Sequence, residues 1–181
     1  MIRYINSLLG VAAVFFFTVH GITMGLFLAG YLDYSPTRKY WGYALLVCVI
    51  LHGILSMMLV IFADGKRKHT AYFKKNAGTH AQRILGIISA ILIYRHMAAY
   101  GYVNEAGVYI FREPTFGRFI TEFTMALVVG AHIVLSLPKA AITLGVITSQ
   151  EEMKNQRNLA YMIFFIVESV AFYGLYQYFL G

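Results

Sequence analysis

Long apolar runs dominate the chain, and short polar connections separate them. The runs fall near residues 5–31, 41–63, 84–103, 119–138 and 158–180. The first run has no Asp, Glu, Lys or Arg between Tyr4 and Leu32. This uncharged stretch is longer than the roughly 20 residues that a helix needs to cross a bilayer. A segment in lipid must satisfy its own backbone hydrogen bonds, so each run is expected to be a helix. The pattern predicts an all-α membrane protein with five transmembrane helices.

The composition agrees with this fold class and excludes others. Hydrophobic residues make up 59% of the 181 residues and charged residues only 13%, about half the charged share of a soluble domain. A single cysteine, Cys48, excludes a disulfide scaffold. The longest connection runs only from Asp64 to about Arg83, so we expect one transmembrane domain over residues 1–181.

The net charge of +7 gives an orientation and does not indicate nucleic-acid binding, because the basic residues lie between the apolar runs. With a cytoplasmic N-terminus, ten of the 15 basic residues lie on the cytoplasmic side and four on the other side. The ten are Arg3, Lys66, Arg67, Lys68, Lys74, Lys75, Arg83, Lys139, Lys154 and Arg157. We therefore expect the N-terminus inside and the C-terminus outside.

Four of the six histidines lie within apolar runs, one in each of the first four: His20, His52, His96 and His132. An ionisable side chain inside a membrane is costly, and such residues commonly mark function. A single histidine of this kind is a neutral imidazole, hydrogen-bonded to a neighbouring helix, as often as it is a functional group. Four of them, on four successive helices, favour a shared role.

Depth in the membrane sorts these histidines into two pairs. At about 1.5 Å per residue, His20 and His96 lie roughly 23 and 18 Å from the inner ends of their helices, and His52 and His132 roughly 16 and 9 Å from theirs. In an up-down bundle of four helices, the first and third helices are diagonal partners, as are the second and fourth. Each pair can therefore face across the bundle centre.

A pair of facing imidazoles at each of two levels suits bis-histidine ligation of two haems, since a haem iron takes one axial nitrogen from each side. Small residues near the histidines, namely Ala13, Ser89, Gly21 and Gly53, permit a flat cofactor and equally permit close helix packing. Zinc would need ligands converging on one point. A proton pump would usually add acidic partners, and the acids within the spans, Glu122 and Glu168, are not one turn from a histidine.

Local strings along nearly the whole chain give a family resemblance. They are Ser7-Leu8-Leu9-Gly10-Val11 before Val19-His20, Leu51-His52-Gly53-Ile54, Gln82-Arg83-Ile84-Leu85-Gly86-Ile87-Ile88 before His96, then His132, Gly145-Val146-Ile147-Thr148 and Gln156-Arg157. In order and spacing they resemble the five-helix, di-haem cytochrome b anchor subunit of succinate dehydrogenases and fumarate reductases.

The resemblance implies a function in electron transfer in the prokaryotic cytoplasmic membrane. His20 and His96 would ligate the haem b distal to the catalytic subunits, and His52 and His132 the proximal one. An iron–sulfur subunit would dock on the cytoplasmic side and carry an FAD-bearing flavoprotein subunit. Electrons would pass through the haems between these subunits and a membrane quinone, expected to be menaquinone. This chain would not itself act on succinate.

Charged residues near the histidines have expected roles as well. Arg83 and Lys139 are candidates to pair with haem propionates, and Arg95 to serve the outer haem or reach the headgroups. The basic connection from Lys66 to Lys75 suits either a docking surface or anionic lipid.

The chain also departs from the family pattern. Asp33 is the only acid in the first connection and the candidate for protonating quinone there. Some relatives carry Glu two residues before the fourth-helix histidine, where this chain has Gly130. We expect Glu168 to be protonated and hydrogen-bonded to a neighbour.

Two other classes stay open. The first is the di-haem cytochrome b subunit of a membrane hydrogenase, formate dehydrogenase or heterodisulfide reductase, which places its ligands on different helices. The second is a small channel or transporter with histidines along its pore.

Overall fold

The computed structural model spans residues 1–181 and describes all of them except 34, 64–72, 100, 104, 106–108 and 112. Five long helices make up most of it: α1 (Ile2–Leu28), α2 (Pro36–Met58), α3 (Phe73–Ala99), α4 (Phe116–Thr143) and α5 (Gln150–Leu180). A π-helical turn, η1 (Leu59–Ala63), extends α2, and β1 (Gly101–Val103) pairs antiparallel with β2 (Tyr109–Phe111). The predicted all-α class is confirmed, and this small hairpin is an addition to it.

Four helices are long and apolar enough to cross a membrane: α1, α4, α5 and the stretch Thr37–Phe62 that joins α2 to most of η1. The membrane character predicted from the sequence is thereby confirmed. Among the described residues α3 does not meet the same criterion. Its first turns carry Lys74 and Lys75, and Arg83 and Arg95 bound or interrupt its apolar part. A fifth membrane span therefore stays a prediction.

Each helix begins before its apolar run, and at α4 and α5 a capping side chain, not hydropathy, marks the start. Helix α5 starts at Gln150 instead of near residue 158. There the Ser149 side chain accepts from the Glu152 backbone N–H at 3.2 Å, and the Glu152 carboxylate accepts from the Ser149 N–H at 3.1 Å. This reciprocal capping box satisfies two backbone donors that the first turn would otherwise leave unpaired. Helix α4 begins in a similar way, with Thr115 accepting from the Arg118 N–H.

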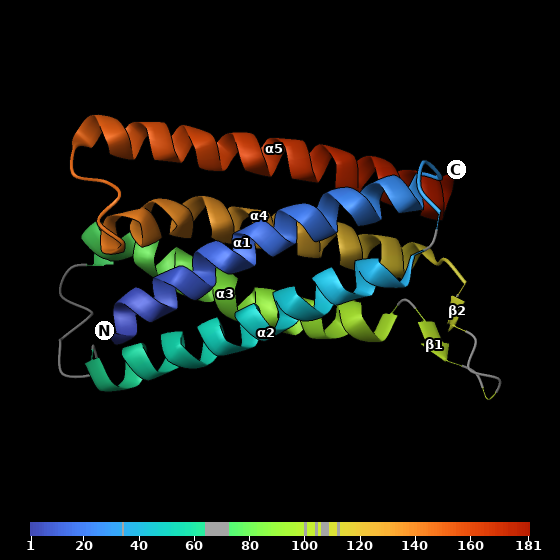
Figure 1. Ribbon diagram of the computed structural model, residues 1–181, viewed down its shortest axis with the longest axis horizontal. Helices are drawn as coiled ribbons and strands as arrows, with labels where there is room; N and C mark the ends of the chain where they lie inside the picture. The colour runs from blue at the N-terminus through green and yellow to red at the C-terminus, as the bar shows by residue number, and fades with distance from the viewer. Residues whose placement is uncertain (34, 64–72, 100, 104, 106–108, 112) are drawn as a thin grey trace.

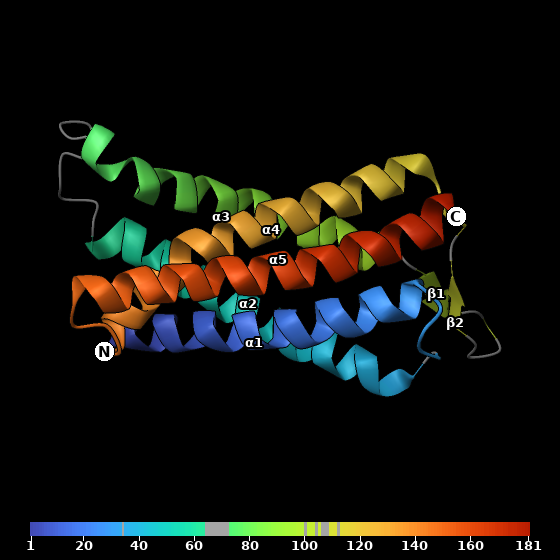
Figure 2. The same ribbon diagram turned by 90° about the horizontal axis from the view of Figure 1, so that it is seen from above.

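Consecutive helices run in opposite directions along the long axis of the molecule (Figure 1). Helices α1 and α4 lie side by side, with α5 against one face of this pair (Figure 2). On the other side, α2 packs on α1 and α3 packs on α4. Over the described residues, α2 and α3 are not among the closely packed helix pairs. The chain thus forms two helical hairpins, α1/α2 and α3/α4, joined through α1 and α4.

Buried residues gather where α1, α4 and α5 meet. They are Gly25 of α1, Ala126, Gly130 and Ile133 of α4, and Ala160, Val167, Gly174 and Leu175 of α5. Small residues let membrane helices approach closely, and packing at such sites replaces the hydrophobic effect that drives soluble folding. Large apolar side chains elsewhere, such as Ile87 and Phe165, point outward, as a lipid-facing surface requires.

Candidate functional site

The histidines of α1 and α3 lie together. The ring centres of His20 and His96 are 6.3 Å apart, and their planes are nearly perpendicular, at 88°. His96 is on the opposite hairpin from His20, so the contact crosses the molecule diagonally. We call these two residues the outer pair.

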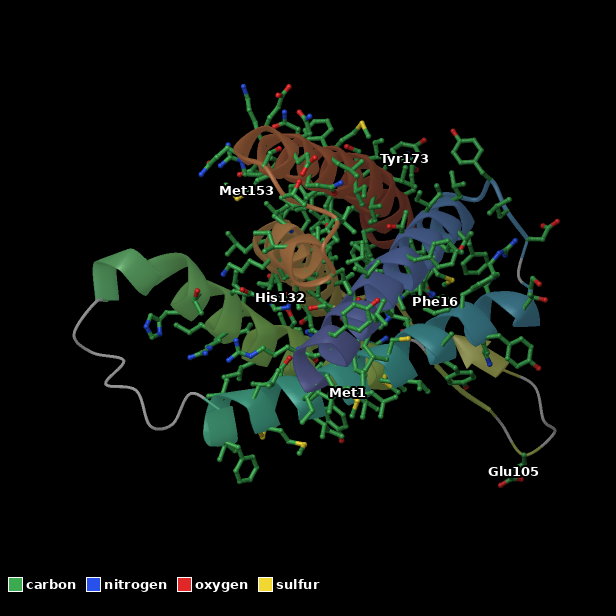
Figure 3. The ribbon with its side chains drawn as sticks, turned by 60° about the vertical axis from the view of Figure 1, so that its left-hand side comes forward. Met1, Phe16, Glu105, His132, Met153 and Tyr173 are labelled. Atoms are coloured by element: carbon green, nitrogen blue, oxygen red, sulfur yellow. The ribbon has the colours of Figure 1, made fainter. Side chains whose placement is uncertain are left out.

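The histidines of α2 and α4, His52 and His132, are the second pair that helix depth predicts. Figure 3 shows His132 on the inner side of α4, among the helices. Each ring donates from Nδ1 to a backbone carbonyl of the other helix in its own hairpin: His52 to Asn6 at 3.0 Å, and His132 to Gln82 at 2.9 Å. We call these two residues the inner pair. The fold therefore brings together the outer pair that helix depth predicts, and it turns each ring of the inner pair toward the other helix of its own hairpin, while the contact between His52 and His132 stays a prediction.

Three of the four rings lie directly on a glycine of the neighbouring helix. A methyl group added to Gly10 would stand 3.2 Å from Cε1 of His52, one on Gly42 would stand 3.2 Å from Cε1 of His20, and one on Gly86 would stand 3.1 Å from Cε1 of His132. These separations are tighter than ordinary carbon contacts, so any larger residue at these positions would displace the ring. The glycines set the position of each imidazole.

The small residues chosen from the sequence are different ones. Gly21 faces Val167 of α5, and Gly53 has no neighbour within 4 Å. Gly21 therefore lies at a close helix contact, and the role of Gly53 in making room for a flat cofactor stays a prediction.

The fourth ring has a carboxylate neighbour that the sequence did not reveal. His96 Nδ1 lies 2.6 Å from Oε2 of Glu122 on α4, and Glu122 is only 2% exposed. Sequence spacing placed no acid one turn from a histidine, but this contact is made between helices. Only the register of α3 against α4 could have revealed it.

His20 differs from the inner pair in its hydrogen bonding. Its Nδ1 is buried and has no hydrogen-bond partner among the described residues. Arg38 stands four residues before Gly42, just as Asn6 stands four before Gly10 and Gln82 four before Gly86. The position of a carbonyl acceptor is thus repeated, although the bond itself is not formed.

Basic side chains gather where the first half of α3 lies against the C-terminal part of α4. Lys139 Nζ donates to Gln82 Oε1 at 2.7 Å and to Thr79 Oγ1 at 3.3 Å. The Gln82 backbone carbonyl also accepts from His132 Nδ1. Lys139 is therefore linked to His132 through Gln82, and the other predicted propionate partner, Arg83, is the next residue of α3.

The other candidates from the sequence are exposed or lie outside the described residues. Arg95 is exposed on α3. The Asp33 side chain is exposed in the connection after α1, and its backbone carbonyl accepts from Arg38. The connection from Lys66 to Lys75 falls outside the described residues up to residue 72, and no side-chain placement is given for Lys74 or Lys75.

Glu168 of α5 is the second buried acid. It is 3% exposed, and among the described residues no donor bonds either carboxyl oxygen, so the expected hydrogen bond is not found. Its Oε1 lies 2.7 Å from where a Cβ on Gly130 would be, so glycine at residue 130 makes room for this carboxyl group.

Within the described part of the chain, no three His, Cys, Asp or Glu side chains converge as a metal cluster would require. No protein-family model, no curated protein and no solved structure matches this chain. The fold and the site define a mainly helical protein with four helices long and apolar enough to cross a membrane and with one of four histidines on each of α1 to α4.

Proposed function

We propose that this chain is a transmembrane di-haem cytochrome b subunit. In this proposal α1 to α4 form an up-down bundle around two b haems, one held by His20 and His96 and the other by His52 and His132. The subunit carries electrons between a membrane quinone and the iron–sulfur and FAD-bearing flavoprotein subunits of a succinate:quinone oxidoreductase. The proposed quinone is menaquinone.

The separation of the outer pair carries the proposal. An imidazole nitrogen lies about 2.0–2.1 Å from a bound metal ion and about 1.1 Å from its own ring centre, so two imidazoles on opposite sides of one ion have centres about 6.3 Å apart. The rings of His20 and His96 are 6.3 Å apart. Edge-to-face ring pairs also adopt this separation with crossed planes, so the spectrum described below tests whether an iron lies between the rings.

The hydrogen bonds of the rings support ligation through Nε2. In His52, His96 and His132, Nδ1 faces a carbonyl or carboxylate oxygen of the neighbouring helix. A histidine that donates from Nδ1 keeps its lone pair on Nε2 and is fixed in orientation. These hydrogen bonds hold each imidazole in the fixed orientation that a metal ligand requires.

The residues around the rings have separate tasks in this function. A bound haem would supply a one-electron carrier, and the protein would supply its axial nitrogens, orientation and low-dielectric surroundings. Arg83 and Lys139 offer cationic donors to propionates at the inner end, where charge-assisted bonds are strong. Arg95, exposed on α3, is assigned to the outer haem or to lipid headgroups. Asp33 is assigned to quinone protonation.

The first test is a reduced-minus-oxidised spectrum of the purified protein. We expect a b-type signal, with flavoprotein and iron–sulfur subunits purifying alongside the chain. A b-type signal with hydrogenase, formate dehydrogenase or heterodisulfide reductase subunits would assign the chain to the rival electron-transfer class. No haem signal would exclude both classes.

A channel or transporter is the second candidate, and the buried contact between His96 and Glu122 favours it, because carboxylate–histidine pairs can relay protons. Proton flux into liposomes containing the haem-free protein would support this function. Flux that depends on neither residue would count against it.

Alanine at the ring-facing glycines should disturb one haem at a time. Gly42→Ala pushes on His20, and Gly86→Ala pushes on His132. Displacing a supported ligand weakens metal binding by about 10–100-fold. We expect Gly42→Ala to weaken retention of the outer haem and Gly86→Ala that of the inner haem, as measured by haem loss to apomyoglobin. Equal loss of both haems from each variant would contradict this assignment.

A further inference from the structure

The four histidine-bearing helices share one spacing. In each of them the histidine comes ten residues after the position that faces the histidine of the neighbouring helix. The four pairs of positions are Gly10 and His20, Gly42 and His52, Gly86 and His96, and Glu122 and His132. The four helices have only these positions in common, so the shared spacing is not visible as a repeat in the sequence.

The spacing makes each hairpin reciprocal. In α1/α2, Gly10 faces His52 while Gly42 faces His20. In α3/α4, Gly86 faces His132 in the same way, and position 122 faces His96. Both hairpins therefore have the same antiparallel register. Three of the four facing positions are glycine, and the fourth is Glu122.

This one difference changes what the ring bonds to. Glycine has no side chain, so the backbone of the neighbouring helix is accessible to the ring. In the inner pair each ring bonds to the backbone carbonyl one turn before the facing glycine, at 3.0 Å for His52 and 2.9 Å for His132. Position 122 has a side chain, and its carboxylate lies 2.6 Å from His96 Nδ1. A hydrogen bond to a carboxylate is shorter and roughly twice as strong as one to a neutral carbonyl.

We infer that Glu122 is a positioning residue that acts through His96 and holds the reduction potential of the outer haem below the value that glycine at residue 122 would give. The inference rests on the proposed haem function. A carboxylate that accepts from Nδ1 makes the imidazole a more basic ligand. A more basic axial nitrogen stabilises ferric iron over ferrous iron, which lowers the potential.

The burial of Glu122 makes this effect large. Its side chain is 2% exposed, and a charge-assisted bond is stronger where water is excluded. His52 and His132 bond to neutral carbonyls, so the inner haem lacks such a carboxylate. The two haems would then differ in potential through a single side chain of α4.

The test is a spectroelectrochemical titration of the purified, haem-loaded protein and of two variants. Glu122→Gly recreates the arrangement of the other three positions, and Glu122→Gln keeps the side-chain shape without the carboxylate. We expect the ratio of reduced to oxidised outer haem, at the wild-type midpoint, to rise about tenfold, which is about 59 mV for one electron. The outer component is assigned by its absence from His20→Ala, and the low-spin electron paramagnetic resonance signal of that haem should shift as well.

Glu168→Gln is the matched control, since Glu168 is also a buried acid but its carboxyl group forms no hydrogen bond among the described residues. It should leave both midpoints unchanged. An unchanged outer midpoint in both Glu122 variants would overturn the inference while leaving the haem function intact. Equal shifts of both haems would also overturn it, as would loss of the outer haem from both variants, because Glu122 would then serve assembly. A wild-type protein without haem would overturn the proposed function and this inference with it.

Discussion

His20→Ala and His96→Ala are each expected to remove the same haem, and His52→Ala and His132→Ala to remove the other. In the proposed function each substitution would delete one of two axial nitrogens, and an iron left with one imidazole would lose both affinity and its low-spin state. The haem content of each variant should fall by about half, because each deletion affects only one of the two ligand pairs. Pyridine haemochrome assays and redox titrations measure which component is lost.

His80→Ala is the control, because His80 lies in α3 outside the two pairs. It should keep the full haem content. The pairing also forbids one result: His20→Ala and His52→Ala must not remove a shared haem, although these two residues lie on adjacent, closely packed helices. A shared loss would show that ligation runs within a hairpin and not diagonally across the molecule.

The fold class followed from the sequence because lipid imposes one simple rule. Apolar runs of sufficient length must be helical, and this rule located four helices that could span the membrane. It could not locate the helix ends, as α5 shows. Its first turn is polar and is held by Ser149 and Glu152, whose hydrogen bonds depend on local backbone geometry and not on hydropathy.

For the candidate site, too, one part could be predicted from the sequence and another could not. The depth of each histidine follows from counting residues along a helix, so its diagonal partner could be predicted. The contacts of each ring depend on the rotation and register of a second helix, which one sequence does not contain. Gly42 and Glu122 were therefore missed as neighbours of His20 and His96, although both lie against these rings.

Gly174→Ala, at the single glycine of α5, is expected to destabilise the protein without touching the histidines. A Cβ at Gly174 would collide with the backbone carbonyl oxygen of Gly25, and its distance to the Gly25 Cα would be 2.8 Å. Helices α1 and α5 touch here through their backbones, near the C-terminal ends of both helices (Figure 1). A backbone cannot rotate away as a side chain can, so the two helices must separate.

Overpacking of this kind costs about 1–3 kcal/mol, which should appear as a lower free energy of unfolding in detergent. Gly53→Ala in α2 makes the same chemical change where a Cβ meets nothing within 4 Å. Alanine is the better helix former by up to about 1 kcal/mol, so this control should be neutral or slightly stabilising. If both variants unfolded at the wild-type free energy, the close backbone contact between α1 and α5 would be wrong. If only Gly174→Ala lost stability while retaining both haems, α5 would serve to hold α1 and α4 together and not to bind the cofactors.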